Sequence, residues 1–213
     1  MNNRIIICTG GRLGDWIHSC ISPGDRLIGA DRGALFLVQQ GYKPDLALGD
    51  FDSVTSDELA LIQANSGETI TYDPIDKDYT DTELAFRYAL DKNPAEIRML
   101  GALGTRFDHS LANVHLLKLA LEKGIPASIT DAHNTISLAE EGVTSLQHND
   151  YSHVSLLPLS EEVTGITLRG FAYPLHEATL RIGQSLGISN ILAEPVGTIT
   201  VRTGTLLVIQ SKD

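Results

Sequence analysis

The sequence predicts an α/β protein, with a doubly wound, mostly parallel N-terminal sheet followed by a C-terminal antiparallel β-sandwich. Up to residue 133, short apolar runs alternate with helical patterns, as in a parallel sheet with helical crossovers. After that residue, short apolar or β-branched runs are separated by Gly, Pro, Asn and Asp, a pattern typical of sandwiches and small barrels. We therefore predict two domains, 1–133 and 134–213.

The first domain is predicted element by element from apolar runs and helix boundary signals. Strands are expected near 4–9, 26–30, 46–48, 69–72, 97–100 and 126–130. Helices are expected to end near Gln40, Ala64 and Asp91 and before Gly124. Two of them begin with capping-box sequences, one starting at Thr55 and the other at Thr80.

The second domain shows no convincing amphipathic helix. Its short runs predict strands near 135–138, 151–157, 165–168, 188–192, 197–201 and 206–210.

Composition limits the classes of function. The chain has 213 residues and a formal net charge of -11, with no cluster of Lys and Arg, so nucleic acid is not an expected partner. No apolar run approaches membrane-spanning length, and no signal peptide is evident. Cys8 and Cys20 are the only cysteines and form no CxxC pair. A reducing, cytoplasmic location is expected.

The segment Gly49-Asp50-Phe51-Asp52-Ser53 directly follows a predicted buried strand. Residues two apart in an extended chain face the same way, so Asp50 and Asp52 are expected to face one point at the carboxyl end of that strand. Two converging carboxylates repel each other unless a cation lies between them or one is protonated. Mg2+ shared with phosphate oxygens is the natural occupant. The alternative interpretation is a solvated acidic turn.

Further charged residues follow other strands of the first domain. The acids are Asp31, Asp78, Asp81 and Asp108, and the bases interleaved with them are Arg32, Lys77, Arg106 and His109. This mixture suits a metal–nucleotide complex, because carboxylates bind the metal and cations neutralise phosphate oxygens. The P-loop and protein-kinase signatures are missing. Asp81 has a competing explanation, since helix dipoles favour carboxylates at helix N-termini.

A set of short motifs, spread in order over nearly the whole chain, resembles the bacterial thiamine pyrophosphokinase family. The motifs are 30–34, 44–45 with 49–53, 77–78 with 80–83, 101–102 with 106–109 and Asn113, and 187–190. One departure is Thr105, which stands where a second glycine is expected. That difference bears on the conformation of its loop.

The resemblance implies an activity and a set of site residues. The reaction is ATP plus thiamine giving thiamine diphosphate plus AMP, with Mg2+, in a homodimer whose active sites lie between subunits. The implied residues are Asp50, Asp52, Asp81 and Asp108 for catalysis; Asp50, Asp52, Asp78 and Asp81 for the metal; Asp31, Arg32, Lys77, Asp78, Arg106 and His109 for the nucleotide; and Ser189 and Asn190 for thiamine. Either Asp81 or Asp108 is expected to accept the hydroxyl proton. An ordinary turn is the alternative interpretation of Ser189-Asn190.

Two other classes of protein share some of these features. A haloacid-dehalogenase-like phosphatase also carries D-x-D after an apolar strand, and Asp50 would then be a covalent nucleophile. That motif normally follows the first strand, whereas two strands precede Asp50 here. A non-catalytic nucleotide or thiamine sensor on the same fold is the other class, but every expected acid is present.

Overall fold

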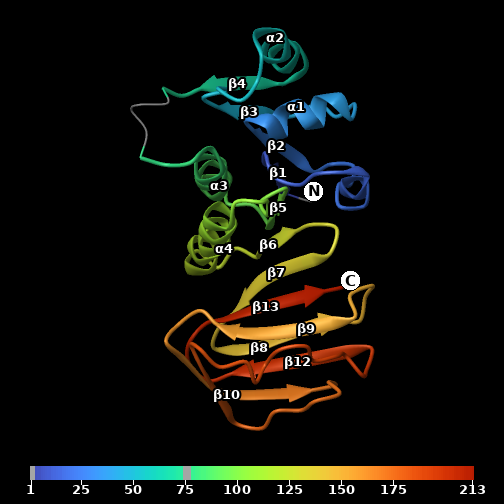
Figure 1. The fold of residues 1–213 in the computed structure, drawn as a ribbon, viewed down its shortest axis with the longest axis vertical. Coiled ribbons are helices and arrows are strands. Elements are labelled where there is room, and N and C mark those ends of the chain that lie inside the picture. Colours follow the sequence, from blue (N-terminus) through green and yellow to red (C-terminus); the bar gives the residue numbers. More distant parts are fainter. Residues whose placement is uncertain (1–2, 74–77) are drawn as a thin grey trace. The chain divides into compact units, whose positions relative to one another are not determined.

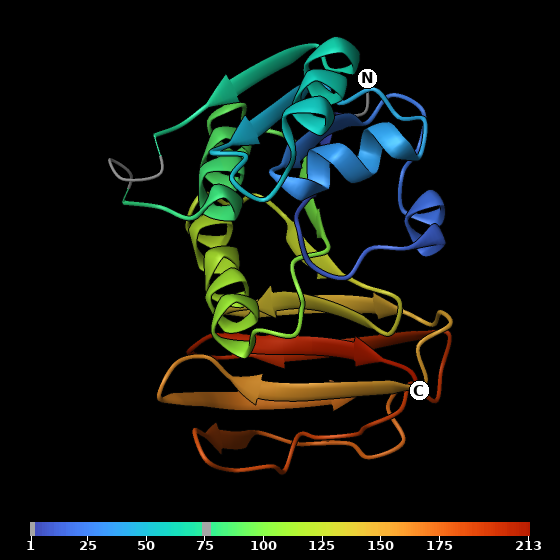
Figure 2. The same cartoon turned by 45° about the horizontal axis from the view of Figure 1, so that its top comes forward.

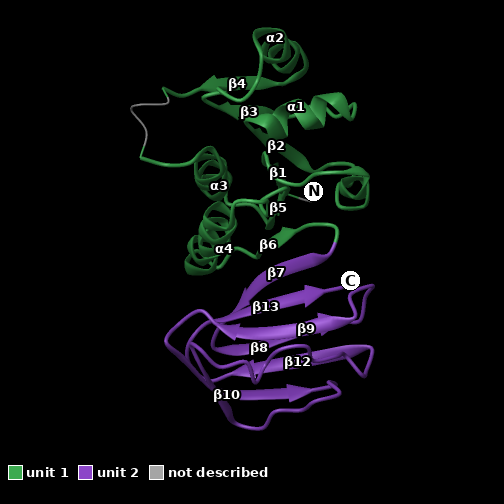
Figure 3. Ribbon diagram, in the orientation of Figure 1, with its two compact units in different colours: residues 1–132 green, residues 133–213 purple. Residues whose placement is uncertain are grey.

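A computed structural model describes residues 3–73 and 78–213 of the chain. The chain folds as two compact units, residues 1–132 (unit 1) and 133–213 (unit 2), which are coloured separately in Figure 3. Within the described part of the chain, no helix is both long and apolar enough to cross a bilayer.

Unit 1 contains a parallel sheet in the order β4-β3-β2-β1-β5-β6 (Figure 1). The strands are β1 Arg4–Cys8, β2 Arg26–Ala30, β3 Leu46–Gly49, β4 Glu68–Thr71, β5 Glu96–Leu100 and β6 Ala127–Thr130. Strands covered on both faces need continuous apolar sequence, and Ile5, Ile6 and Ile7 are correspondingly buried. Cys8 is also a core residue, and burial raises the pKa of its thiol to about 12.

The helices of unit 1 form two pairs. They are α1 Arg32–Gln39, α2 Ser56–Asn65, α3 Asp81–Asp91 and α4 Phe107–Glu122, and a short 3-10 helix, η1, spans Asp15–Ser19. Helix α1 packs on α2, and α3 packs on α4. Figure 2 shows the two pairs on opposite sides of the parallel sheet, so the predicted doubly wound arrangement is confirmed.

The two predicted capping boxes differ in the structure. At α2 the box is complete, because Glu58 N–H donates to the Thr55 hydroxyl and Thr55 N–H donates to the Glu58 carboxylate. At α3 the Thr80 hydroxyl accepts a hydrogen bond from Glu83 N–H. The carboxylate of Glu83 instead accepts a 2.8 Å hydrogen bond from Arg87, one helical turn further on.

Strand β1 marks the point where the order of the sheet reverses. From β1 the chain builds outward through β2 and β3 to β4 on one side, then returns to place β5 and β6 on the other side. The carboxyl ends of the neighbouring strands β1 and β5 lie at this point. In open α/β sheets, the crevice at this point is where ligands bind.

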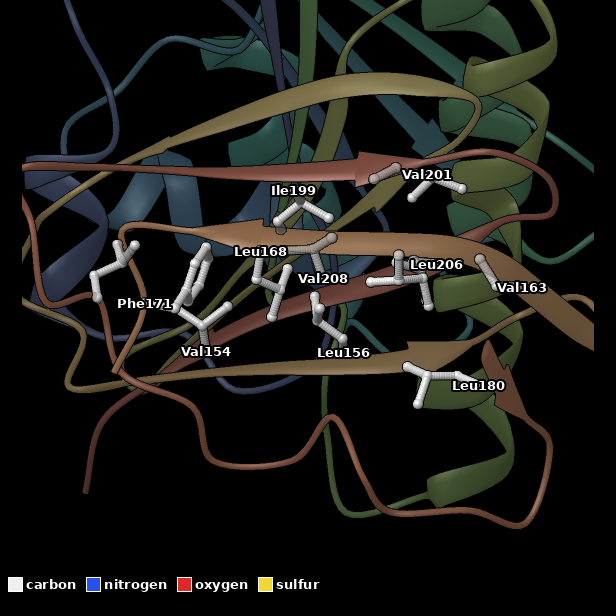
Figure 4. Packing of buried hydrophobic residues seen from close by; sticks show 13 residues of the cluster. Val154, Leu156, Val163, Leu168, Phe171, Leu180, Ile199, Val201, Leu206 and Val208 are labelled. Atoms are coloured by element: carbon white, nitrogen blue, oxygen red, sulfur yellow. The ribbon is translucent and has the colours of Figure 1, made fainter. Parts of the chain in front are cut away.

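Unit 2 consists of antiparallel strands in the orders β7-β13-β9 and β11-β10-β12-β8. The strands are β7 Asn134–Ala139, β8 Gly142–Gln147, β9 His153–Pro158, β10 Glu162–Arg169, β11 Ala178–Arg181, β12 Val196–Val201 and β13 Leu206–Ser211. Alternate residues turn inward, so Leu206 and Val208 of β13 share one core with Ile199 and Val201 of β12 (Figure 4).

The strand predictions for unit 2 were incomplete. Strands β8 and β11 were missed because β8 has a mostly polar sequence with Val143 exposed, and β11 is only four residues long. The segment 188–192 does not form a continuous strand; it makes isolated antiparallel bridges at Asn190 and Leu192. Ser189 has φ 57°, in the left-handed region, and this interrupts the extended backbone.

The amino end of β1 is tied to the loop before β2 by a shielded ion pair. Arg4 Nε and Nη2 donate to the two carboxylate oxygens of Asp25 at 2.9 and 2.5 Å, and the Asp25 side chain is fully buried. Burial by itself raises the pKa of Asp25. The hydrogen bonds from Arg4 and from Ser22 N–H, with the charge of Arg4, together outweigh burial and leave this pKa below its usual value.

We expect Asp25→Asn to destabilise unit 1 by about 2 kcal/mol at neutral pH, the scale of hydrogen bonds to charged groups. Because the folded-state pKa is lowered, the stabilisation by Asp25 is complete above about pH 4 and is lost as pH falls through the lowered pKa. Urea unfolding followed by the fluorescence of Trp16, the single tryptophan, would measure both effects in unit 1.

Asp91→Asn is the matched control, because Asp91 forms an exposed 3.4 Å pair with Lys123 and its loss should cost no more than about 0.5 kcal/mol. Equal effects of the two substitutions would contradict a special role for the Arg4–Asp25 pair.

Candidate functional site

A cavity of about 320 Å³ lies in unit 1 at the carboxyl ends of the parallel strands. It occupies the crevice between the loops after β1 and β5, where the order of the strands predicts a ligand site. Its lining residues come from five segments: 9–11, Ala30 with Asp31, 80–82, 101–102 with 104–106, and His109, Ser110 and Asn113.

The loops after β1 and β5, which both line the cavity, are joined through their main chains. Gly11 N–H donates to Gly101 C=O at 2.9 Å, and Arg12 N–H donates to Leu103 C=O at 3.1 Å. The buried Thr9 hydroxyl also donates to Gly101 C=O, at 2.6 Å. A Cβ atom on Gly11 would lie 2.1 Å from the Gly101 oxygen, so only glycine allows this approach. Gly10 and Gly11, which follow β1, thus form part of the cavity wall.

Asp31, Asp50 and Asp52 converge at the ends of β2 and β3. One carboxylate oxygen from each lies within 4.8 Å of the others. The loop 50–52 turns tightly, because Asp52 N–H donates to Asp50 Oδ1 at 3.1 Å and Phe51, with φ 57°, is buried beneath it. The structure thus brings the predicted pair Asp50 and Asp52 together. It adds Asp31, which the sequence indicated only as a nucleotide-binding residue.

The backbone at Asp31 has an unusual conformation. Its φ of 50° and ψ of -120° are rarely adopted by a residue with a side chain. Asp31 N–H donates to Leu48 C=O at 2.9 Å, which holds the residue against β3. Opposite it, Gly49 has φ 149°, and a Cβ there would lie 3.3 Å from the Asp31 Cβ. The fold therefore holds Asp31 in a strained position that directs it to the cluster.

The two oxygens of Asp31 have different surroundings. Oδ2 accepts a 2.6 Å hydrogen bond from the Ser53 hydroxyl, whereas Oδ1 is buried and has no hydrogen-bond partner among the described residues. Burial raises the pKa of Asp31, and the nearby charges of Asp81 and Asp50 raise it further, against the effect of the Ser53 hydrogen bond. The three carboxylates of Asp31, Asp50 and Asp52 form an oxygen donor set that fits Mg2+.

The segment before α3 carries the next group of predicted residues. Asp81, the first residue of α3, lines the cavity together with Thr80 and Thr82. Asp78 is exposed, and it is neither among the cavity-lining residues nor in the Asp31–Asp50–Asp52 cluster. Lys77 lies outside the described residues.

At the start of α4, Arg106 and Asp108 form an ion pair. Arg106 Nη2 donates to Asp108 Oδ2 at 2.6 Å, and both side chains are largely exposed. The hydrogen bond from Arg106 lowers the pKa of Asp108 and keeps it ionised. Arg106 and His109 line the cavity, whereas Asp108 is not among its lining residues.

The loop that contains Thr105 is closed by Ser110. Its hydroxyl accepts from Gly104 N–H at 3.0 Å and donates to Arg106 C=O at 3.1 Å. Thr105 is not among the residues with positive φ, so its side chain is compatible with the backbone where a glycine was expected.

Arg32 begins α1 and faces a different hollow. Its Nη1 donates to Ser53 C=O at 3.2 Å, and it lines a smaller cavity of about 180 Å³ together with Gly10, Gly11 and Phe36.

In unit 2, Ser189 and Asn190 differ in accessibility. Ser189 is exposed, with its N–H bound to the Ser155 hydroxyl at 3.0 Å. Asn190 is buried, and its amide binds the backbone of Tyr173: Oδ1 accepts from Tyr173 N–H at 3.0 Å and Nδ2 donates to Tyr173 C=O at 2.7 Å. Oδ1 also accepts from Ile191 N–H. Asn190 thereby fixes the backbone at Tyr173, whose side chain is exposed.

Several residues of the site were not singled out by the sequence analysis. Ser53 and Asn113 stood in the motifs, but no role was derived for them, and Thr9 and Ser110 carried no signal. Asn113 is buried and donates to Ala102 C=O at 2.8 Å, which fixes the loop after β5. One signal could have identified Asn113. It is a polar residue at an otherwise apolar position of a helix that follows a ligand-binding loop.

These features define a class of protein. A parallel α/β sheet with a cavity at its switch point, lined by Asp31, Asp81 and Arg106, is typical of α/β proteins that bind a ligand at the carboxyl ends of their strands.

Comparison with known proteins defines the family. Residues 17–129 match the family described as "Thiamin pyrophosphokinase, catalytic domain", and residues 140–206 match "Thiamin pyrophosphokinase, vitamin B1 binding domain". The thiamine pyrophosphokinase of Bacillus subtilis (strain 168) is 35% identical over 187 residues, which cover 87% of each chain. The chain belongs to the thiamine pyrophosphokinase family, whose known reaction is transfer of a pyrophosphoryl group from ATP to thiamine.

Solved structures agree with this membership. The crystal structure of the Bacillus subtilis thiamine pyrophosphokinase has a TM-score of 0.92 at 32% identity and covers 99% of both chains. The Geobacillus thermodenitrificans thiamin pyrophosphokinase has a TM-score of 0.89 at 32% identity, covering 99% of this chain and 98% of that one. The family resemblance seen in the sequence is confirmed, and the phosphatase alternative is set aside.

We expect Gly11→Ala to destabilise unit 1 by about 3 kcal/mol and to lower turnover, because the added methyl group collides with the Gly101 carbonyl. Urea unfolding followed by Trp16 fluorescence and steady-state turnover would measure the two effects.

Gly10→Ala is the control at the adjacent position, where the nearest atom to an added Cβ is the Arg32 Cβ at an ordinary 3.6 Å. Retention of full stability and turnover by both variants would mean that the close contact of the two loops is unimportant.

Proposed function

We propose that this chain transfers the diphosphate group of ATP to the hydroxyl of thiamine, releasing AMP, with ATP bound in the cavity of unit 1. The observation that carries the proposal is the position of Asp31, which belongs both to the carboxylate cluster and to the lining of the cavity. A metal held by the cluster would therefore border the space that holds the phosphates. Arg106 provides a cationic group on the same cavity.

The proposed metal is Mg2+, held by Asp50, Asp52 and Asp31. When bound, it would supply charge neutralisation for the phosphate oxygens. The protein itself positions the reactants, since attack on the β-phosphorus requires the hydroxyl and the leaving AMP to lie in line. We further propose Asp78 and Asp81 as ligands or water-mediated partners of the same metal, and Lys77, Arg32 and His109 as nucleotide contacts.

Between the two candidate bases we propose Asp81 as the acceptor of the thiamine hydroxyl proton. Asp81 lines the cavity, whereas Asp108 is exposed and its pKa is lowered by Arg106, which makes Asp108 a weaker base. The role proposed for Asp108 is to orient Arg106 toward the phosphates through their 2.6 Å ion pair.

Thiamine recognition is proposed for unit 2. A flat aromatic ring requires an apolar surface with few polar groups. The exposed Tyr173 ring offers such a surface, Ser189 supplies a hydroxyl, and Asn190 holds the backbone between them through its bonds to Tyr173. We propose that the chain acts as a cytoplasmic homodimer whose thiamine site is completed by the partner subunit. The motive is the family resemblance, together with exposed Ile182 and Leu186 in unit 2.

The decisive experiment is a direct assay of the full chain with ATP, Mg2+ and thiamine. Equimolar thiamine diphosphate and AMP are expected. Formation of ADP would indicate transfer of a single phosphoryl group, and binding of both substrates without products would identify a sensor.

We expect Asp50→Asn and Asp52→Asn each to lower turnover about 10²-fold or more while leaving the fold intact, because each removes a charge that stabilises the transition state. Steady-state rates at saturating Mg2+ and circular dichroism would test this. Asp57→Asn is the control, since Asp57 is an exposed acid in the first turn of α2. Near-normal turnover of both cluster variants would refute the role of the cluster.

We expect Asn190→Ala to raise the KM for thiamine and to leave the KM for Mg-ATP nearly unchanged. The substitution removes both hydrogen bonds to the Tyr173 backbone, so the proposed thiamine-binding surface would no longer be held in place. Arg106→Ala is the reciprocal variant and should raise the KM for ATP more than that for thiamine. Steady-state kinetics with each substrate varied in turn would measure both. A uniform effect of either variant on the two substrates would count against the division of roles between the units.

A further inference from the structure

We propose that Ser53 is a positioning residue for the metal site: its hydroxyl fixes the Asp31 carboxylate so that Oδ1 is presented to the metal between Asp50 and Asp52. The inference rests on the proposed metal site and goes beyond it, because it gives a specific task to a side chain outside the carboxylate cluster. The carrying observation is the 2.6 Å hydrogen bond from Ser53 Oγ to Asp31 Oδ2, beside a buried Oδ1 that has no partner among the described residues.

Ser53 is itself held in place from two sides. Its carbonyl accepts a 3.2 Å hydrogen bond from Arg32 Nη1, and the turn that contains Ser53 is closed by the 3.3 Å bond from Val54 N–H to Phe51 C=O. Phe51 is buried against the helices α1 and α2 together with Ala34 and Ile62. The hydroxyl therefore projects from a braced loop, and its position relative to Asp31 is set by the fold.

The chemistry of a carboxylate explains why this bond matters. Each carboxylate has two oxygens, and a hydrogen bond to one of them restricts rotation of the group and selects the other for a ligand. Donors and acceptors that bind the ligands of a metal typically contribute about 10- to 100-fold to its affinity. The charge of Asp50 repels the Asp31 carboxylate, and the hydrogen bonds from Ser53 and from the Arg32 backbone oppose this repulsion. Without the Ser53 donor, only the backbone bond from Arg32 would remain.

The hydrogen bond from Ser53 to Asp31 should contribute little to the stability of the folded chain. Ser53 is exposed, so loss of its hydroxyl should have only a small effect on the unfolding midpoint. The two roles therefore predict different outcomes. If Ser53 positions Asp31, loss of its hydroxyl lowers metal affinity, whereas if its role is only structural, the loss lowers only the unfolding midpoint.

The test is a titration of the full-length protein with Mn2+, a paramagnetic substitute for Mg2+, with free Mn2+ followed by electron paramagnetic resonance. Ser53→Ala is expected to raise the Kd for Mn2+ about tenfold or more. Ser53→Thr keeps the hydroxyl and should bind Mn2+ as the unchanged chain does. Ser66→Ala is the matched control, because the Ser66 hydroxyl is buried near the end of α2 without a partner among the described residues. It should leave the Kd unchanged.

Asp50→Asn separates failure of this inference from failure of the proposed metal site. Unchanged Mn2+ binding by Asp50→Asn would refute the metal site itself. Weak binding by Asp50→Asn with unchanged binding by Ser53→Ala would leave the metal site standing and overturn the role of Ser53. Equal weakening by Ser53→Ala and Ser53→Thr would also overturn it, because the hydroxyl would then not be the active feature.

Discussion

The candidate site of unit 1 depends on a fold that holds three carboxylates together against their mutual repulsion. Oxygens of Asp31, Asp50 and Asp52 lie within 4.8 Å of one another, and Asp31 adopts a strained backbone to reach this position. Such strain persists only where the surrounding structure fixes the residue firmly. The buried core of the parallel strands and the turn over Phe51 provide that support. A bound cation would relieve the repulsion, so we expect folding and metal binding to reinforce each other.

Much of the fold could be predicted because its elements are encoded locally. Alternating apolar runs and helix caps located the strands and helices of unit 1, and the D-x-D sequence after β3 located two members of the cluster. The third member, Asp31, comes from a different strand. The position of Asp31 follows from the parallel pairing of β2 with β3, in which Ala30 lies opposite Leu48. It also depends on the positive φ of Asp31, which no local sequence pattern predicts.

Other features could not be predicted because they depend on contacts distant in sequence. Asn190 was expected to bind thiamine, yet its amide is buried against the backbone of Tyr173, 17 positions away. The ion pair of Arg106 with Asp108 was missed for a different reason: the two residues are near in sequence, but Arg106 was expected to bind the nucleotide and Asp108 to act in catalysis. Edge strands such as β11 carry too little apolar sequence to stand out from the loops around them.

The close approach of the loops after β1 and β5 bears on how a mutational scan of this enzyme family would be interpreted. Replacing each residue in turn would mark Gly11 and Gly33 as severely as the acids, because an added Cβ would lie 2.1 and 2.0 Å from the carbonyl oxygens of Gly101 and Cys8. Neither glycine has a side chain to offer a ligand. Loss of activity at these positions would report excluded volume and not the loss of a side chain that binds a ligand.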